Sequence, residues 1–531
     1  MSAEDGTSGI PARGDLPEPV RSQGGPGYRD DPALMAWVES VGRRLVEDLV
    51  AGTARTAPIL TYGRPEDHHA ALADSVGLPV RAGEPAHPPT ALGLAVESIL
   101  ARAVKSEHPR FFNQSWAGAD PVAVLGDWLT ARLNTTGATY EMAPLFTLME
   151  DELLGRMAEL AGFAAPAAGP RTEAGAHGLF APGGATSNLY ALHVARAWKD
   201  PGGLASGQRR RLVAFTSAQS HYSIGKAMAL AGLGRDNLIE IPTDAAGRMD
   251  PEALAAAVEA ARVEGGEPFF VNATAGTTVT GAFDPIDRVA DVADRFGLWL
   301  HVDGSYGGSA MLSPRERGRL DGLARARSFA FNPHKLMGIT QQCALLLLRD
   351  GALLGPAFSA GASYIFQPDK NEADLDLGDL TLQCGRRADG LKLWLTWKAR
   401  GERWFADRIE RSVDLAARLE RHLHEDPRFA LAHPRTFANV GFWWLPEDLR
   451  PLSRPLQPAT KARLHALAPR IKDGLQRAGS AMLGYQPLGD RPNFFRMVVM
   501  SPDLRFEDLV RTLEIVDDIG RRVEAETSQG R

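Results

Sequence analysis

A lysine and an aspartate that follow two short apolar runs are the residues best suited to act together in chemistry. Lys335 comes shortly after the run Ser328–Phe331, in the sequence Asn-Pro-His-Lys, and Asp303 closes the run 298–302. If both runs are strands of one sheet, the amine and the carboxylate lie at neighbouring strand ends. Pyridoxal phosphate requires these two groups, an amine for a Schiff base and a carboxylate that keeps the ring nitrogen protonated. The pair therefore predicts a pyridoxal phosphate site.

Other polar residues would surround the same cofactor. Gly184 lies in a double-glycine turn before an expected helix, where converging backbone N–H groups favour an anion such as a phosphate, although a plain glycine loop is the alternative. Asn332 and His334 flank the lysine and can donate to the same phosphate. His221 follows the run 212–216 and can stack on the cofactor ring. The segment 274–278 offers hydroxyls to the ring oxygen or to Asp303, but a structural turn fits its composition equally well.

The middle of the chain must supply the strands that position these residues. Short apolar runs alternate with helical patterns, which predicts a mostly parallel sheet with helices on both faces. Asp250-Pro251 and Asp284-Pro285 each resemble a capping carboxylate before a proline at the first helical position. Strands are expected at 212–216, 238–241, 269–273, 298–303, 328–331 and 344–348, and further on at 441–444 and 495–500.

Length and composition predict several domains in an ordinary globular chain of 531 residues. Residues 1–33 are rich in Gly, Pro and charged residues, and we expect a disordered tail without a signal peptide. The pattern after it predicts a helical segment over 34–127, a large cofactor-binding domain over 128–393 and a small α/β domain over 394–531. The last domain is expected to end in an amphipathic helix from Phe506 to Val523.

Charge and cysteine content exclude several classes of function. A net charge of −6 gives no general attraction to nucleic acid or to anionic membranes, and no apolar run is long enough to span a bilayer. Cys343 and Cys384 are the only cysteines and form no disulfide framework, which suits a reducing cytoplasm. No cysteine pair or His-Glu-x-x-His arrangement has the spacing of metal ligands, so no metal is expected.

Seven motifs, spread from residue 108 to near the C-terminus, resemble the group II pyridoxal-phosphate-dependent amino acid decarboxylases. Within this family they are most similar to the acidic-substrate branch, which includes glutamate, aspartate and cysteine sulfinate decarboxylases. The resemblance implies the fold of the type I pyridoxal phosphate enzymes, which is also that of aspartate aminotransferase. The motifs occupy residues 108–114, 139–144, 271–278, 332–335, 366–370, 383–386 and 484–487.

The resemblance implies a role for each matching residue. Lys335 is the lysine that carries the cofactor, Asp303 pairs with the ring nitrogen and His221 stacks on the ring. Tyr364 matches a tyrosine on a mobile loop that returns a proton to the α carbon after CO2 leaves, and Arg496, with Gln114 beside it, matches the group that binds the distal acid of the substrate. The cofactor-binding set would also include Gly184, Ala185, Thr278, Asn332 and His334.

The family also implies a homodimer with the active site at the subunit interface, an acidic amino acid as substrate, and CO2 and an amine as products. The loop carrying Tyr364 is then expected to reach into the active site of the other subunit. On the residues alone, an aminotransferase on the same fold, a decarboxylase of a noncanonical or larger amino acid, and a catalytically silent binding module are the alternatives.

Two segments depart from the family and leave the identity of the substrate open. Animal glutamate decarboxylases carry Asn-Met-Phe where this chain has Thr136, Gly137 and Ala138, and the missing ring removes on the order of 150–250 Å² of packing surface. The family often has Ala-Ala-Trp after the cofactor aspartate, where this chain has Gly304, Ser305 and Tyr306.

Overall fold

The computed structural model describes residues 31–74, 76, 87–164, 175–367 and 369–529. Contacts between Cα atoms divide the chain into two compact units, Met1–Ala51 with Arg64–Arg102, and Gly52–Gly63 with Ala103–Arg531. The expected tail over 1–33 lies outside the described residues except for its last three, and a helix already begins at Pro32. Residues 52–63 and 103–127 group with the rest of the chain and not with the first helices, and the other domain boundaries remain predictions.

The first unit contains three helices, of which α3 packs against both of the others. Apolar residues recur along α1 at spacings of three and four, from Met35 to Leu49. Their bounds are α1 (Pro32–Ala51), α2 (Pro65–Ala73) and α3 (Pro89–Arg102).

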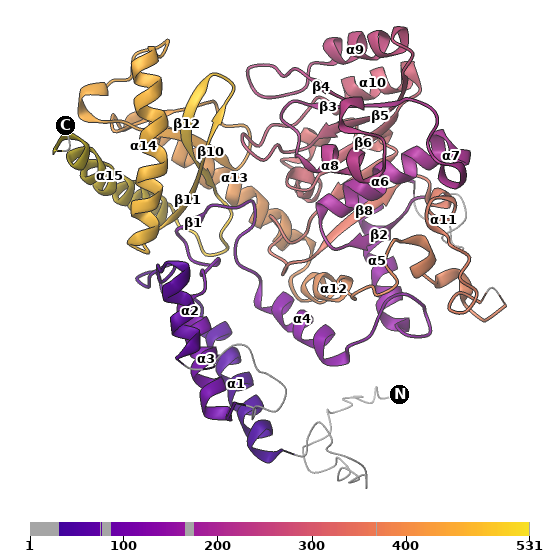
Figure 1. The fold of residues 1–531 in the computed structure, drawn as a ribbon, viewed down its shortest axis with the longest axis horizontal. Helices are drawn as coiled ribbons and strands as arrows, with labels where there is room; N and C mark the ends of the chain where they lie inside the picture. Colours follow the sequence, from indigo (N-terminus) through magenta and orange to yellow (C-terminus); the bar gives the residue numbers. More distant parts are fainter. Residues whose placement is uncertain (1–30, 75, 77–86, 165–174, 368, 530–531) are drawn as a thin grey trace, which may run out of the picture. The chain divides into compact units, whose positions relative to one another are not determined.

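The second unit is built around a seven-stranded sheet, which Figure 1 shows with its helices. Its order is β2-β8-β7-β6-β5-β3-β4, and the strands from β7 to β4 run parallel, whereas β8 is antiparallel to both of its neighbours. The predicted mostly parallel sheet is therefore confirmed. The strands are β2 (His177–Ala181), β3 (Leu212–Ser217), β4 (Leu238–Ile241), β5 (Glu267–Thr274), β6 (Trp299–Gly304), β7 (Ser328–Phe331) and β8 (Ala344–Leu348).

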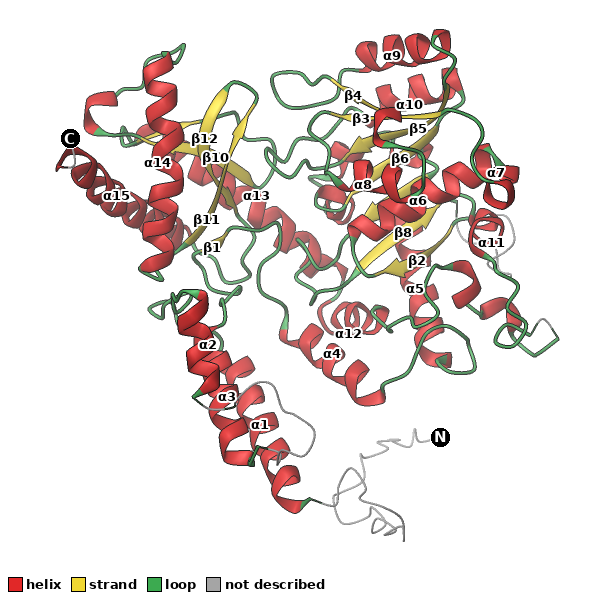
Figure 2. Ribbon diagram, in the orientation of Figure 1, coloured by secondary structure: helices red, strands yellow, loops and turns green. Residues whose placement is uncertain are grey.

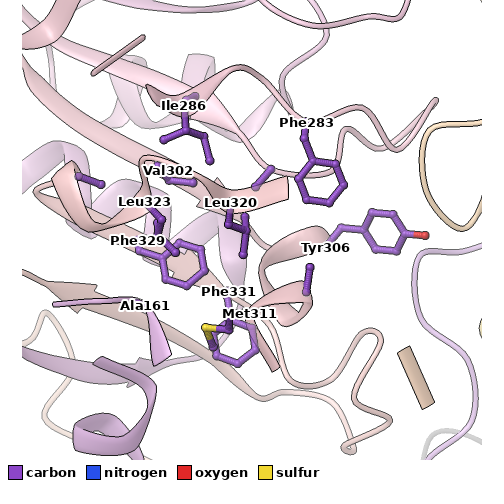
Figure 3. Close-up of a cluster of buried hydrophobic side chains, with 14 of the residues drawn as sticks. Ala161, Phe283, Ile286, Val302, Tyr306, Met311, Leu320, Leu323, Phe329 and Phe331 are labelled. Carbon is purple, nitrogen blue, oxygen red and sulfur yellow. The ribbon is translucent and has the colours of Figure 1, made fainter. Parts of the chain in front are cut away.

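Helices cover both faces of this sheet. Successive side chains of a strand point to opposite faces, and here both sets are apolar, so each face needs a cover. Leu345 and Leu347 belong to a core with α9 and α10, whereas Leu346 and Leu348 belong to a core with α6 and α8. Phe329 and Phe331 stack in the first core with ring centroids 6.0 Å apart, and Figure 3 shows Tyr306 at its edge with the hydroxyl directed away. The helices are α6 (Gly184–Lys199), α8 (Ser223–Leu230), α9 (Pro251–Val263) and α10 (Ile286–Phe296).

A second sheet of five strands completes this unit, and Figure 2 shows both sheets in yellow. Its order is β1-β11-β12-β10-β9, antiparallel except for the pairing of β1 with β11. Apolar residues of α13, α14 and α15 pack against this sheet and form one hydrophobic core with its strands. The elements are β1 (Phe111–Phe112), β9 (Phe429–Leu431), β10 (Asn439–Trp444), β11 (Met482–Leu488), β12 (Arg491–Val498), α13 (Glu402–Glu425), α14 (Pro458–Arg477) and α15 (Phe506–Gln529).

The remaining α-helices of this unit are α4 and α5, which precede β2 in sequence, α7, which lies between β2 and β3, and α11 and α12, which follow β8. Helix α12 packs against both α4 and α5. No helix within the described ranges is both long and apolar enough to cross a membrane. These helices are α4 (Pro121–Leu133), α5 (Pro144–Leu160), α7 (Pro201–Ser206), α11 (Leu354–Phe358) and α12 (Gly390–Arg400).

Of the two aspartates predicted to cap a helix at an Asp-Pro step, one does so and the other does not. Asp250 caps α9 as predicted and accepts hydrogen bonds from the N–H groups of Glu252 and Ala253 at 2.9 and 3.1 Å. Asp284 caps no helix, since α10 begins one residue later than expected, at Ile286. The Asp284 carboxylate instead accepts the backbone N–H groups of Met249 and Thr274, both at 2.7 Å. Two buried backbone N–H groups of distant segments need an acceptor, and Asp284 supplies it instead of capping the helix.

Candidate active site

Asp303 lies at the carboxyl end of β6, where the sheet register sets it beside Thr274 of β5 and Ala330 of β7. One carboxylate oxygen accepts the Ser305 N–H at 3.0 Å and the other accepts the Asn188 side-chain amide at 2.8 Å. Burial alone would raise the pKa of Asp303, but the hydrogen bonds from Ser305 and Asn188 oppose the effect of burial, and the pKa is lowered overall. The carboxylate is therefore held ionised and can pair with a protonated ring nitrogen.

Lys335 follows β7, the strand next to β6, so the sheet brings the lysine and the aspartate to one edge as the sequence predicted. Burial of the amine lowers the pKa of Lys335, Asp303 opposes this shift and Arg496 adds to it. A lowered pKa increases the share of neutral amine, which is the form that attacks an aldehyde carbon. The three charged groups thus belong to one site.

His221 follows the end of β3, and Ser223 holds the orientation of its ring. The Nδ1 atom of His221 accepts the backbone N–H of Ser223 at 3.3 Å and lies 2.9 Å from the Ser223 hydroxyl. Because Nδ1 accepts from a backbone N–H, the ring proton is on Nε2. Burial lowers the pKa of His221, with Asp303 opposing the shift. A neutral, oriented imidazole of this kind can stack on a cofactor ring.

The N-terminus of α6 forms a cradle that fits a phosphate group. Gly184 opens this helix, and a Cβ added there would overlap the Ser305 hydroxyl and stand 2.9 Å from the Asn332 side-chain nitrogen. The Asn332 side-chain oxygen is buried and has no hydrogen-bond partner within the described ranges. Bare backbone at a helix start, two polar side chains and no bulk are what a phosphate requires. The residues present therefore fit pyridoxal phosphate: Gly184 and Asn332 would hold its phosphate, and His221 and Asp303 would hold its ring.

The predicted companions of this cradle differ in how they are placed. Ala185 occupies the second position of α6, and His334 is buried after β7, where its Nδ1 lies 2.6 Å from the Cys343 carbonyl oxygen. Burial lowers the pKa of His334 to about 4, so the ring is neutral. Thr278 contributes its backbone, since its carbonyl oxygen accepts from Arg496 and Asn439, whereas Thr274 is the threonine in register with Asp303.

Arg496 is a buried cation without an acidic partner in the part of the chain that the structure describes. Its side chain lies in β12, the residue is 8% exposed, and burial lowers its pKa. The guanidinium donates to the carbonyl oxygens of Thr278 and Asn113 at 2.8 and 3.0 Å, while Nε has no partner among the described residues. Gln114 follows Asn113 directly and is exposed. An uncompensated buried charge is costly and indicates a site for an anionic group.

Tyr364 is the one predicted catalytic residue that a single chain does not bring to the others. Its ring is 80% exposed, so it cannot lie with the buried groups around Lys335. The loop is nevertheless anchored beyond it, because Asp376 is buried, accepts the Tyr140 N–H at 2.9 Å and forms an ion pair with Lys370 at 2.7 Å. Tyr364 and several described residues between it and this anchor, among them Asn371 and Glu372, are exposed.

The segment that departs from animal glutamate decarboxylases is filled by this same loop. The Ala138 carbonyl oxygen accepts the N–H groups of Leu377 and Gly378 at 3.0 and 2.7 Å. A methyl group added at Gly378 would lie 2.7 Å from the Phe366 ring and 3.2 Å from the Ala138 Cβ. Phe366, Gly378 and Ala138 therefore lie together, so the ring of Phe366 stands close to this segment.

Sequence reasoning missed three residues that hold the site together, Asn188, His301 and Ser223. Their hydrogen bonds join Asp303 to His221. A signal for two of them was present in the sequence. Asn188 is four residues after Gly184, on the same face of a helix, and His301 is two residues before Asp303, on the same face of a strand.

A lysine and an aspartate at adjacent ends of a parallel sheet, with a phosphate cradle at a helix start, define a pyridoxal phosphate enzyme of fold type I. Residues 75–445 match the pyridoxal-dependent decarboxylase conserved domain. The chain is 40% identical to the acidic amino acid decarboxylase GADL1 of Bos taurus over 490 residues, 91% of each chain. It is 45% identical to the cysteine sulfinic acid decarboxylase of Mus musculus over 420 residues, 78% of this chain and 82% of the relative.

A solved structure gives the same result. The crystal structure of mouse CSAD matches with a TM-score of 0.85 at 39% identity, covering 92% of this chain and 99% of that one. The chain therefore belongs to the pyridoxal-dependent decarboxylase family. The predictions of the family with its acidic-substrate branch, the fold, the cofactor and the carboxy-lyase class are confirmed.

Proposed function

We propose that the chain removes the α-carboxylate of an amino acid whose side chain ends in an acidic group, with Arg496 binding that group. The observation that carries the proposal is the buried guanidinium of Arg496, which has carbonyl oxygens for partners but no acid within the described residues. Its unpartnered Nε leaves a donor for one more oxygen. The names of the GADL1 and cysteine sulfinic acid decarboxylase relatives support an acidic substrate.

A second cation strengthens this interpretation. Lys472 of α14 donates to the Asn113 side-chain oxygen at 3.3 Å, while Arg496 donates to the Asn113 backbone oxygen. Burial lowers the pKa of Lys472, and the charge of Arg496 adds to the shift. Two neighbouring cations repel each other, so an anion placed beside them removes an unfavourable interaction. A carboxylate, sulfinate or sulfonate would each meet this requirement.

The residues of this chain have separate tasks in the proposed reaction. Pyridoxal phosphate, when bound, supplies an electron-withdrawing ring that stabilises negative charge at the α carbon. Lys335 holds the cofactor, Asp303 keeps its ring nitrogen protonated, and His221 covers the ring and presents an Nε2 proton. Gln114 assists Arg496 in fixing the distal acid. Tyr364 returns a proton to the α carbon as a general acid.

We also propose that the active enzyme is a homodimer, because the site is incomplete in one chain. Tyr364 and Gln114 are exposed, although both are assigned to the active site. Helix α4 carries leucines at intervals of four that are 40–55% exposed, and two further leucines of α5 are 47–66% exposed. Contiguous exposed apolar residues mark interaction sites. The exposed leucines are Leu125, Leu129, Leu133, Leu145 and Leu148.

A cytoplasmic location is part of the same proposal. Both Cys343 and Cys384 are free thiols in the structure, which agrees with a reducing compartment.

The substrate is tested by measuring CO2 release from glutamate, aspartate, cysteine sulfinate and cysteate, with leucine as a neutral comparison. We expect turnover of at least one acidic amino acid and none of leucine. Equal turnover of leucine, or release of a keto acid instead of CO2, would reject the proposed reaction.

The dimer is tested by mixing two inactive variants, Lys335→Ala and Tyr364→Phe. If each site takes its lysine from one chain and its tyrosine from the other, mixed dimers regain one intact site. Random exchange of subunits would restore about a quarter of the wild-type activity, because half of the dimers are mixed and each has one good site. A mixture as inactive as its components would contradict a shared site.

A further inference from the structure

We infer that Asn188 is a positioning residue that orients the partner of the ring nitrogen and the stacking histidine at the same time. Its side chain lies in α6 and is 1% exposed. The amide nitrogen donates to Asp303 at 2.8 Å and to the Ser223 hydroxyl at 2.9 Å, and Ser223 in turn contacts His221. One buried amide therefore joins the two residues on which a cofactor ring would rest.

The amide oxygen of Asn188 is held from the opposite side by His301. His301 Nε2 lies 3.0 Å from this oxygen and His301 Nδ1 lies 2.8 Å from the Ser328 hydroxyl. The Trp299 indole N–H donates to the same hydroxyl oxygen at 2.8 Å. All these atoms are buried, and each side-chain polar atom of Asn188 and His301 has a partner. The network is therefore fully satisfied, which makes it rigid.

The direction of every hydrogen bond in this network follows from the donors that cannot reverse. An indole nitrogen only donates, so the Ser328 hydroxyl oxygen accepts from Trp299. The Asn188 amide oxygen can only accept, so His301 carries a proton on Nε2 and donates it to this oxygen. In neutral His301 the Nδ1 atom then accepts the hydroxyl proton of Ser328. The opposite amide orientation would point the Asn188 oxygen at the Asp303 carboxylate. Asn188 must therefore donate both of its amide hydrogens, one to Asp303 and one to Ser223.

This arrangement gives the site a defined protonation pattern before any ligand enters. The donor from Asn188 favours the ionised form of Asp303. The Ser223 hydroxyl, having accepted from Asn188, is free to donate its proton to His221 Nδ1, which leaves the His221 proton on Nε2. Neutral His301 adds no charge beside Asp303, since burial lowers its pKa to about 4. Loss of Asn188 would disturb Asp303 and His221 together.

The test measures affinity for pyridoxal phosphate, and not only turnover. Apo-protein is titrated with pyridoxal phosphate and binding is followed by the quenching of tryptophan fluorescence and by the visible absorbance of the bound cofactor. We expect Asn188→Ala to raise the Kd roughly tenfold or more, as loss of a hydrogen bond to a charged group does. The isosteric Asn188→Asp keeps the volume but presents an oxygen to Asp303, and we expect it to weaken binding as well.

A double-mutant cycle separates positioning from general destabilisation. His301→Ala should weaken cofactor binding in the wild type but add little in the Asn188→Ala background, because His301 acts through Asn188. The control is Asn493→Ala, which removes a buried asparagine of β12 whose side chain donates to the His465 carbonyl oxygen of α14. We expect this control to leave the Kd unchanged.

Two results would overturn the inference. One is an unchanged Kd in both Asn188 variants, shown by melting curves to be folded. The other is a full, additive effect of His301→Ala without Asn188. If Asn188→Ala does not fold, the isosteric aspartate variant alone decides, since it preserves packing.

Discussion

The two ends of the active site differ in how far one chain completes them. Around Asp303 and His221, Asn188, His301 and Ser223 are buried or nearly so, and the hydrogen bonds between them leave none of the three unpartnered. Around Arg496 the guanidinium lacks an acid within the described residues, and Tyr364 is exposed. The proposed cofactor end is thus held in place by the fold of one chain, whereas the proposed substrate end has a buried cation without an acid and an exposed tyrosine. A permanent cofactor and a transient substrate place these different demands on the protein.

The comparison between two buried arginines sharpens the point. Arg386 is 4% exposed and pairs with Glu150 at 2.7 Å, and it also donates to the Gly137 carbonyl oxygen. Arg496 is 8% exposed and has carbonyl oxygens for partners but no acid among the described residues. The Nε atom of each arginine is without a hydrogen-bond partner there, so the acidic partner is the difference between the two. A buried arginine that is paired with an acid stabilises the fold, whereas a buried arginine without an acid can bind an anionic ligand.

The largest effect is expected at the cofactor end, from Asp303→Asn. Asparagine is close in shape but cannot remain anionic, so the ring nitrogen loses its counter-charge. We expect kcat to fall roughly a hundredfold to a thousandfold, the range for removing an electrostatic partner of a transition state. Steady-state CO2 release measures it. Asp517→Asn, which alters a buried carboxylate bonded to Trp444, is the control and should lower thermal stability but not kcat.

At the substrate end, Arg496→Met should act on substrate more than on cofactor. Loss of charged hydrogen bonds to the distal acid is expected to lower kcat/KM about a hundredfold, equivalent to nearly 3 kcal/mol. Affinity for pyridoxal phosphate, measured by titration, should change little. Arg386→Met is the matched control and should reduce stability, because it leaves Glu150 buried without its partner. A similar loss of kcat/KM in a folded Arg386 variant would argue against the distinction between the arginines.

A smaller effect is expected from filling the phosphate cradle with Gly184→Ala. The added methyl group would overlap the Ser305 hydroxyl and crowd Asn332. We expect the Kd for pyridoxal phosphate to rise about tenfold, because overpacking of a close approach costs 1–3 kcal/mol. Gly183→Ala provides the comparison, since its φ is extended and no atom lies within 4 Å of the added Cβ. An equal rise of the Kd in both variants would contradict the assignment of the phosphate to Gly184.

The smallest effect concerns stability and pH at the cofactor end. Burial lowers the pKa of His301 from its ordinary 6.5 to about 4, so the folded chain binds fewer protons than the unfolded chain. The contribution of neutral His301 to stability is complete above pH 6.5 and is lost progressively as the pH falls toward 4. Denaturant unfolding at pH 7.5 and 5.0 should show a smaller decrease for His301→Gln than for the wild type. The exposed His424→Gln should match the wild type.

The runs of apolar residues in the sequence predicted several strands of the large sheet and the sheet edge that carries Lys335 and Asp303. The strands Leu238–Ile241, Ser328–Phe331 and Ala344–Leu348 begin and end as expected, because each is a short apolar run closed by polar or turn residues. Lys335 and Asp303 share a sheet edge because parallel strands end together. Four strands, β1, β2, β9 and β11, were missed. β1 and β9 have only two and three residues, too few for a period, and β2 was interpreted only as the entry to a helix. β11 contains Gly484 and Pro487, which interrupt the pattern of a strand.

The remainder of the site depends on how distant elements pack. The role of Asn188 requires α6 to lie over β6, which no periodicity states. The acceptors that hold Arg496 come from residues 113 and 278, and the ring that packs beside Ala138 comes from Phe366. These contacts join segments hundreds of residues apart, and sequence reasoning without an alignment had no signal for them.

The central claim is that Lys335 carries pyridoxal phosphate within one shared site. Reduction of the cofactor-loaded protein with borohydride, followed by proteolysis and mass spectrometry, tests it directly. The account predicts a reduced phosphopyridoxyl group on the peptide that contains Lys335 and on no other lysine peptide at stoichiometric cofactor. A label on a different lysine, or a fully loaded protein with no label at Lys335, would contradict it.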